Sequence, residues 1–227
     1  MPWQSIKAWG ADSEKAMDAR IDKFHNLTEL GGVATEAVAT GAGRVLHIGR
    51  GSAKIAGAIA MDANPRADAG VIHDYDDLPY PFADNQFNEV LAFELIEHVR
   101  DPMAVMAELH RITRPRGVVK VVTPHWTNPD CASDLTYRNH ISSYSFRNLT
   151  EDRAAFPFYT EVRFKQRIAR VTLPALWKYL GFEFFINLDG RFPSLRFFRQ
   201  IWEHYLNAIV RGKNVYFEME VIKKEPF

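Results

Sequence analysis

Hydrophobic residues in the first half of the chain form short runs, each bounded by a glycine or an acidic residue. The runs are RVLHIG (44–49), AIAMD (58–62), VIHD (71–74), EVLAFE (89–94) and GVVKVVTP (117–124). They do not alternate strictly between apolar and polar positions, which is typical of strands buried on both faces of a parallel sheet. This pattern predicts a parallel sheet.

Two segments repeat apolar residues at the three- and four-residue spacing of a helix. One covers residues 12–30, and the other lies between the last two apolar runs. In the second segment Asp101 is a good N-cap, Pro102 suits the first turn, and Pro115 is expected to stop the helix. A strand–helix–strand unit is therefore predicted here.

The pattern changes from about residue 125. Aromatic, polar and turn residues follow, which predicts a long structured loop of the kind that carries function. Residues 159–172 and 214–223 alternate as strands do, and residues 194–210 have a helical pattern. The helix at 194–210 could dock on the domain, form a dimer surface or touch a membrane, and docking is favoured.

Composition narrows the class of protein. A length of 227 residues suggests one large domain, or one domain with an appendage, at ~150 residues per domain. Lys plus Arg and Asp plus Glu both total 28, so no net charge draws the chain to nucleic acid. The balance disfavours a nucleic-acid partner and favours a small-molecule one.

Cysteine content and hydropathy predict the compartment. The single cysteine, Cys131, excludes an intramolecular disulfide and a zinc site built from several thiolates, and no metal is expected. No stretch approaches the ~18 apolar residues of a membrane span, and no signal sequence is recognised. A cytoplasmic protein without a membrane span is expected.

The segment that carries chemistry is VLHIGRGSAK followed by MDANP. A buried strand ending in Gly49-x-Gly51 lets the backbone turn sharply and approach a ligand closely. Asp62, at the end of the next strand, can accept hydrogen bonds from both hydroxyls of a ribose. A nucleoside-containing cofactor is thus predicted. The same sequence is also compatible with a tight turn that binds no ligand and with an Asp62 that is only solvated.

A dinucleotide cofactor is disfavoured. Its fingerprint requires a third glycine where Lys54 stands, and an acidic residue about 20 positions further on. Asp62 follows Gly51 by only 11 positions. An NAD-dependent enzyme is therefore the weaker alternative.

The order of several motifs resembles a known family. VLHIGRG, MDANP, HDYDDLPYPFADNQFNEVLAFELIEHVRDP and ELHRITRPRGVVKVVTPH resemble class I S-adenosylmethionine-dependent methyltransferases of the small-molecule type with a short first crossover. DLTYRNHISSYSF and the closing VYFEMEVIKK are similar to a loop and to the terminal strand of that family. The resemblance covers most of the chain after the first 40 residues.

The resemblance implies S-adenosylmethionine as cofactor. Gly49 and Gly51 would line its methionine part, with Arg50 between them, and Asp62 would hold the ribose hydroxyls.

The resemblance also implies contacts further along the cofactor. Ala63 would lie against the adenine, and either Asp74 or Asp76 would face the adenine amino group. Phe93 and Glu94 would form the floor near the sulfonium.

Some positions depart from the family pattern. His47 stands where an acidic residue or Asn helps to bind the amino end of the cofactor, and Arg50 replaces a small residue or Cys. Arg50 could pair with the cofactor carboxylate or fill the pocket. A non-catalytic binding module with a degenerate cofactor site is the alternative.

Methyl transfer requires a base only when the nucleophile carries a proton of high pKa. The candidate catalytic residues are His125 after the fifth strand, and Tyr137 and His140 in the long loop. His98 is expected to be structural, and for His125 a structural and a functional role both stay open.

The predicted fold is a Rossmann-like, doubly wound α/β domain. It has a mostly parallel seven-stranded sheet, an antiparallel C-terminal strand and a cap-like C-terminal elaboration. Residues 1–40 form an N-terminal helical segment and 41–227 a single domain, divided into a cofactor-binding half (41–124) and a cap with the final strands (125–227). The predicted activity is methyl transfer to a small or medium-sized acceptor, and a homodimer stays open.

Overall fold

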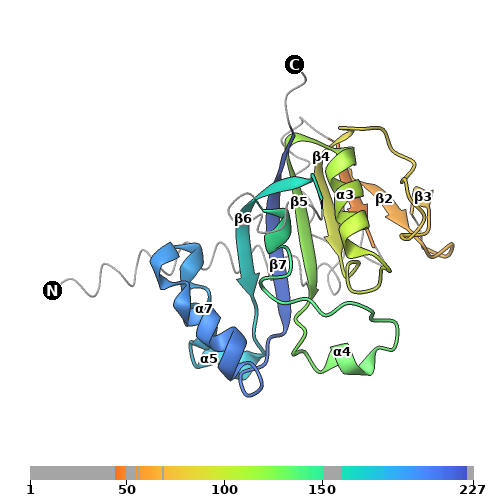
Figure 1. Cartoon of the computed structure of the whole chain (residues 1–227). Helices are drawn as coiled ribbons and strands as arrows, with labels where there is room; N and C mark the ends of the chain where they lie inside the picture. Colours follow the sequence, from red (N-terminus) through yellow and green to blue (C-terminus); the bar gives the residue numbers. More distant parts are fainter. Residues whose placement is uncertain (1–43, 50–54, 56, 68, 151–159, 224–227) are drawn as a thin grey trace.

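The computed structural model describes residues 44–49, 55, 57–67, 69–150 and 160–223. They form a seven-stranded sheet with the strand order β3-β2-β1-β4-β5-β7-β6 (Figure 1). The strands are β1 (Val45–Ile48), β2 (Ile59–Asp62), β3 (Val71–Ile72), β4 (Phe87–Phe93), β5 (Thr113–Pro124), β6 (Arg163–Val171) and β7 (Asn214–Ile222). Strand pairs from β3 to β5 are parallel, whereas β7 is antiparallel to β5 and β6. The predicted Rossmann-like sheet is confirmed.

Helix α3 (Pro102–Ile112) connects β4 to β5, as predicted. The Asp101 carboxylate caps it by accepting hydrogen bonds from the backbone N–H groups of Met103 (2.9 Å) and Ala104 (3.0 Å). The helix ends before Pro115, which lies in the irregular start of β5, where the pairing with β4 shifts register. A proline shortly after the helix end agrees with the prediction, because the helix cannot continue through it.

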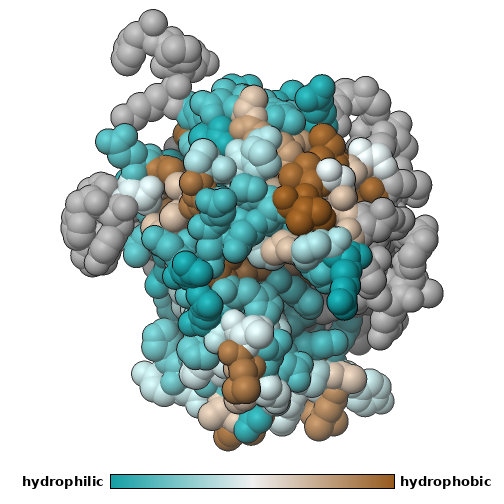
Figure 2. All heavy atoms as spheres, turned by 90° about the vertical axis from the view of Figure 1, so that its right-hand side faces the viewer, coloured by the Kyte–Doolittle hydropathy of each residue, from teal (hydrophilic) through white to brown (hydrophobic). Residues whose placement is uncertain are grey.

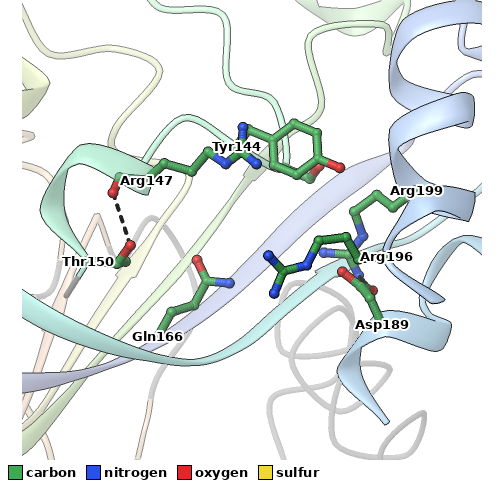
Figure 3. Close-up of a pocket in the computed structure, with 8 residues that line it drawn as sticks. Tyr144, Arg147, Thr150, Gln166, Asp189, Arg196 and Arg199 are labelled. Atoms are coloured by element: carbon green, nitrogen blue, oxygen red, sulfur yellow. Dashed lines mark hydrogen bonds and ion pairs between the residues drawn. The ribbon is translucent and has the colours of Figure 1, made fainter. Parts of the chain in front are cut away.

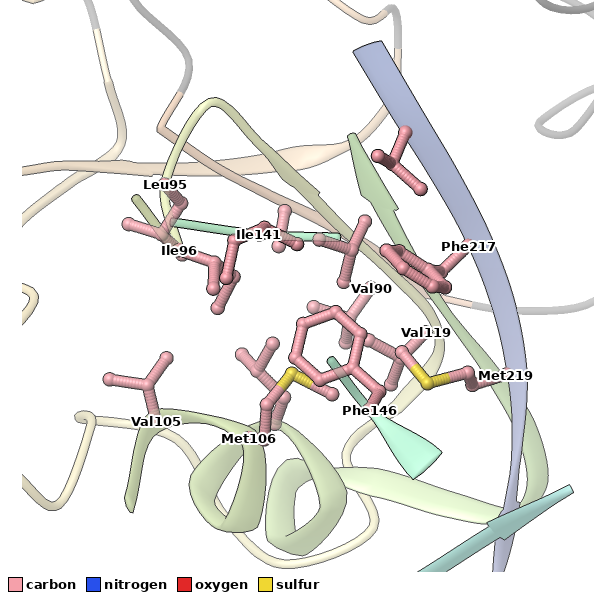
Figure 4. Packing of buried hydrophobic residues seen from close by; sticks show 14 of the residues in the cluster. Val90, Leu95, Ile96, Val105, Met106, Val119, Ile141, Phe146, Phe217 and Met219 are labelled. Atoms are coloured by element: carbon pink, nitrogen blue, oxygen red, sulfur yellow. The ribbon is translucent and has the colours of Figure 1, made fainter. Parts of the chain in front are cut away.

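The main core lies between α3 and the sheet (Figure 4). Met106 of α3 faces Val119 and Met219 of the sheet, and Phe146 closes the group from the segment after β5. The Phe146 ring meets Phe217 edge-on, with ring centroids 4.8 Å apart. The long segment after β5 is therefore anchored in the core by an aromatic side chain.

The segment between β3 and β4 is held to α3 by one arginine. Arg111 donates hydrogen bonds to the carbonyl oxygens of Tyr80 (3.2 Å) and Phe82 (2.9 Å) and forms an ion pair with Glu108 (2.6 Å). Glu108 in turn accepts a hydrogen bond from the Tyr80 N–H (2.7 Å). The Glu and Arg of the ELHR motif thus position the proline-rich segment.

Shorter helices complete the second half of the chain. They are α4 (Asp130–Ser133), η1 (Arg147–Leu149), α5 (Ala175–Tyr179), α6 (Phe182–Ile186), η3 (Leu188–Gly190), η4 (Pro193–Leu195), α7 (Phe197–Ile201) and the π-helical turn η5 (Trp202–Leu206). The helix predicted at 194–210 is thus divided among η4, α7 and η5. The α4 segment lies at the carboxyl end of β5, and α5 and α7 lie beside β6 (Figure 1).

The N-terminal helix predicted at 12–30, like the whole of segment 1–40, lies outside the described residues. The side of the molecule at the β3 edge is mostly hydrophilic, with separate hydrophobic patches (Figure 2). Within the described ranges, no helix has the length and apolar character needed to cross a membrane.

Candidate functional site

The ends of β1, β2 and β4 meet at Gly49. Its φ is +74°, and a Cβ placed on it would lie 2.7 Å from the carbonyl oxygen of Phe93. Its N–H donates a hydrogen bond to the carbonyl oxygen of Met61 (3.2 Å). Both the left-handed backbone and the close approach require glycine here, so the chain turns at this edge of the sheet with no side chain in the way.

Asp62 ends β2 beside this turn and is 4 % exposed. Its Oδ1 accepts a hydrogen bond from the Asn64 N–H (2.8 Å), and its carboxylate is also hydrogen-bonded by the phenol of Tyr75. Burial, with smaller contributions from Asp62 and Asp74, raises the pKa of Tyr75 to about 12. Tyr75 therefore stays protonated at neutral pH and donates a hydrogen bond to Asp62, which fixes the orientation of the carboxylate.

Tyr75 is a site residue that the sequence did not single out. Its only signal was its place in HDYDD, between the two aspartates considered for the adenine. A contact with Asp62 across a turn is not encoded by any local spacing rule.

Asp74 and Asp76 have different surroundings. Asp76 Oδ1 accepts a hydrogen bond from the Arg100 N–H (2.7 Å), and its Oδ2 forms an ion pair with the Arg100 Nε (3.3 Å). The exposed Asp74 accepts a hydrogen bond from the Asp76 N–H (2.9 Å) and caps the turn. Asp76 is therefore engaged with the loop after β4, whereas the Asp74 carboxylate lies at the surface.

His47 lies inside the sheet. It is 2 % exposed, and its ring meets Phe93 edge-on with centroids 5.3 Å apart. Ala63 and Phe93 are half-buried at the same edge, and Glu94 is exposed with a φ of +48°. The structure thus brings the predicted residues of β1, β2 and β4 together.

Arg50 and Gly51 lie outside the described residues. Their expected contacts with the methionine part of the cofactor stay predictions.

His125 lies in the interior, with 0 % of its surface exposed. Its Nδ1 is hydrogen-bonded to the Thr127 hydroxyl (2.7 Å) and its Nε2 to Glu203 Oε1 (3.1 Å), and Gly212 packs against its ring. A ring with both nitrogens engaged and no exposed surface does not reach a substrate in this conformation. The geometry favours the structural role for His125 over that of a base.

Glu203 is the buried partner of that histidine. Burial disfavours its charged form, but hydrogen bonds from His125, Ser143 and Trp126 outweigh burial and lower the pKa of Glu203. The carboxylate therefore joins the segment after β5 to the helices near the C-terminus.

Tyr137 and His140 follow α4 at the carboxyl end of the sheet. His140 is exposed, whereas Tyr137 is half-buried and meets the His98 ring edge-on at 4.8 Å. Burial, together with the Glu97 and Glu94 carboxylates, raises the pKa of Tyr137. At neutral pH Tyr137 is therefore suited to donating a hydrogen bond, and a role as base is left to His140.

Glu97 is a second residue that the sequence did not single out. It is 1 % exposed, its Oε2 accepts a hydrogen bond from the Thr123 hydroxyl (2.9 Å), and its Oε1 has no hydrogen-bond partner in the described part of the chain. Burial, helped by the Glu94 and Asp134 carboxylates, raises the pKa of Glu97 to about 7 against the opposing effect of Thr123. The signal in the sequence was a charged residue inside the apolar run FELIEHV.

Glu97 also organises the backbone around it. Its carbonyl oxygen accepts hydrogen bonds from the N–H groups of Arg138 (2.7 Å) and Asn139 (3.1 Å). Through its carboxyl group and its carbonyl, Glu97 ties the loop after β4 to β5 and to the segment that carries Tyr137 and His140. Across the described residues no group of His, Cys, Asp and Glu is arranged to hold a metal ion.

Comparison with family models found a match to part of the chain. Residues 31–121 match the family model described as Methyltransferase domain. No curated protein matches the sequence.

Solved structures similar to this chain include a putative sarcosine dimethylglycine methyltransferase from Galdieria sulphuraria. It is 14 % identical, with 90 % of this chain and 87 % of that chain covered and a TM-score of 0.51. Another is the complex of the Haloferax volcanii Trm112 methyltransferase activator with the putative methyltransferase (14 % identity, 95 % and 97 % covered, TM-score 0.49). A third is an S-adenosylmethionine-dependent methyltransferase from Mesorhizobium loti (13 % identity, 78 % and 90 % covered, TM-score 0.47). At 14 % identity the likeness to the Galdieria sulphuraria protein concerns the fold alone.

Proposed function

We propose that the chain carries a class I S-adenosylmethionine-dependent methyltransferase domain and transfers a methyl group from S-adenosylmethionine to a small or medium-sized acceptor. The observation that supports this most is the edge formed by Gly49, Asp62 and Phe93. Three strands end there, with a backbone turn free of side chains next to an oriented, buried carboxylate.

The residues at this edge fit the cofactor. The glycine turn leaves space for a ligand to approach the backbone, and Asp62 offers carboxylate oxygens to a pair of ribose hydroxyls. Of the two candidate aspartates, Asp74 would face the adenine, because Asp76 is held by Arg100. Phe93 ends β4 beside Gly49, and Glu94 follows it. When bound, S-adenosylmethionine would supply a methyl group activated by its sulfonium.

The protein's own task is then to align the acceptor and to exclude water. Tyr137 would donate a hydrogen bond to the acceptor, and His140 would take up its proton where the acceptor atom carries one. Glu97 acts as a positioning residue, because it fixes the segment that contains both side chains.

Titration calorimetry with S-adenosylmethionine and S-adenosylhomocysteine tests the proposal. Both ligands are expected to bind, and Asp62→Ala should weaken binding at least ~10-fold, which is about 1.4 kcal/mol. Asp77→Ala is the matched control, because Asp77 is exposed in the nearby turn. No heat with either ligand, or Asp62→Ala behaving like the unchanged protein, would overturn the proposal.

Methyl transfer itself is tested with labelled S-adenosylmethionine and acceptors that offer O, N or C nucleophiles. Transfer to a small acceptor would support the proposed activity. Tight binding of both ligands without transfer to any acceptor would favour a non-catalytic binding module.

A further inference from the structure

A cavity lies beside β6, the edge strand at the other side of the sheet from β3. It has a volume of about 100 Å³ and lies between β6, the segment around η1, and the η3 and α7 helices (Figure 3). Strand β6 is three strands away from β4, which corresponds to roughly 14 Å at the usual spacing of neighbouring strands. The cavity is therefore separate from the proposed cofactor site.

The lining is rich in positive charge. Three guanidinium groups, of Arg147, Arg196 and Arg199, face one carboxylate, that of Asp189. Arg199 is buried and already neutralised, because it forms an ion pair with Asp189 (2.6 Å) and donates a hydrogen bond to the carbonyl oxygen of Ile186 (3.1 Å). The cavity therefore keeps an excess of positive charge after this pair has formed.

The Arg196 side chain can pair with a bound anion. It is exposed, and within the described residues no ion pair or hydrogen bond holds its guanidinium, while its charge acts on Asp189 more weakly than that of Arg199. In Figure 3 this guanidinium points toward the amide group of Gln166, which projects from β6. A planar guanidinium in this position offers two parallel N–H donors to a bound anion.

Tyr144 supplies an independent indication of a ligand. Its hydroxyl is buried and has no hydrogen-bond partner among the described residues, a state that costs free energy. In Figure 3 the hydroxyl points toward the helix that carries Arg199. Burial raises the pKa of Tyr144, so the hydroxyl stays protonated and can donate a hydrogen bond. The Arg147 guanidinium lies over the Tyr144 ring, 4.2 Å from its centroid, and holds the ring in place.

We propose that this cavity binds a phosphate group, through the Arg196 guanidinium and the hydroxyl of Tyr144. The cavity wall carries donor groups from different elements, whereas its one lining carboxylate is already paired, so an anion fits and a cation does not. The volume suits a single compact oxyanion. The phosphate group can belong to inorganic phosphate or to a phosphorylated small molecule that extends into solvent. The proposal does not depend on methyl transfer.

Titration of the full chain with inorganic phosphate, in phosphate-free buffer at constant ionic strength, tests the site. Saturable binding with one phosphate per chain is expected, with a Kd on the order of 1 mM. Arg196→Gln should weaken binding at least ~10-fold and Tyr144→Phe about 3- to 10-fold, because the first change removes a charged donor and the second an uncharged one. Because Arg196 is exposed, Arg196→Gln should fold normally, which a thermal melt checks.

Arg114→Gln is the matched control, because Arg114 is an exposed arginine at the start of β5 and does not line the cavity. If Arg114→Gln weakens binding as much as Arg196→Gln does, the effect is one of general charge and the proposed site is wrong. The absence of saturable binding, unchanged binding by Arg196→Gln, or tighter binding of acetate than of phosphate would also overturn the site. Tighter binding of glycerol 3-phosphate than of inorganic phosphate would identify a phosphorylated molecule as the source.

Discussion

Gly49 meets Phe93 backbone to backbone, so that a Cβ on Gly49 would lie 2.7 Å from the Phe93 carbonyl oxygen. This contact joins the carboxyl ends of β1 and β4, the two strands that flank the proposed cofactor position. The shape of the site is therefore set by the main chain, and changes there should affect binding and stability together.

We expect Gly49→Ala to lower the free energy of unfolding by about 2 kcal/mol, because alanine is strained at this positive φ and collides with Phe93. Affinity for S-adenosylhomocysteine should fall at least ~10-fold, a difference of about 1.4 kcal/mol. Urea unfolding and calorimetry measure the two effects. Gly190→Ala is the matched control, since a Cβ there meets nothing within 4 Å. Equal stability and equal affinity of Gly49→Ala and Gly190→Ala would contradict the prediction.

Tyr75→Phe should weaken the binding of S-adenosylhomocysteine about 3- to 10-fold. The change removes one hydroxyl that orients the Asp62 carboxylate, and a hydrogen bond of this kind contributes about 0.5–1.5 kcal/mol. Tyr179→Phe, at an exposed tyrosine of α5, serves as the control. Unchanged or tighter binding by Tyr75→Phe would show that Tyr75 does not support the ribose-binding carboxylate.

Glu97→Gln should change how stability depends on pH. The pKa of Glu97 is raised from 4.5 to about 7, so its favourable contribution is complete below about pH 4.5 and is lost as the pH rises through about 7. Glutamine stays neutral, and the variant should therefore gain on the order of 3 kcal/mol relative to the unchanged protein over this range. Urea unfolding at a series of pH values measures the difference.

The exposed Glu161 provides the control for that experiment, as Glu161→Gln. A stability difference between Glu97→Gln and the unchanged protein that stays constant with pH would mean that Glu97 titrates normally.

His125→Ala should lower the free energy of unfolding by about 3 kcal/mol, because it removes a buried ring and deprives Glu203 of a hydrogen bond. At a temperature where the variant is folded, its affinity for S-adenosylhomocysteine should be unchanged. His204→Ala, at an exposed histidine of η5, is the control for thermal melts and calorimetry. A normal melting temperature combined with lost methyl transfer would instead support His125 as a base.

Local patterns were sufficient for the elements between residues 44 and 124. Apolar runs bounded by glycine or acidic residues located β1 to β5, and Asp101 with Pro102 located the start of α3. Such signals can be read from the sequence, because burial on a sheet and capping of a helix involve residues that are neighbours in the chain. The start of β5 was less predictable, because its irregular pairing with β4 depends on a partner strand.

The sequence by itself determined where Gly49 and Asp62 fall, since both sit at strand ends that a parallel sheet brings to one edge. Tertiary structure decided what the other charged and polar groups do. It placed His125 against Glu203, Tyr75 against Asp62, and Arg196 and Tyr144 on the walls of one cavity. Hydrogen bonding and protonation depend on burial and on distant segments that pack together, and no local spacing records either of them.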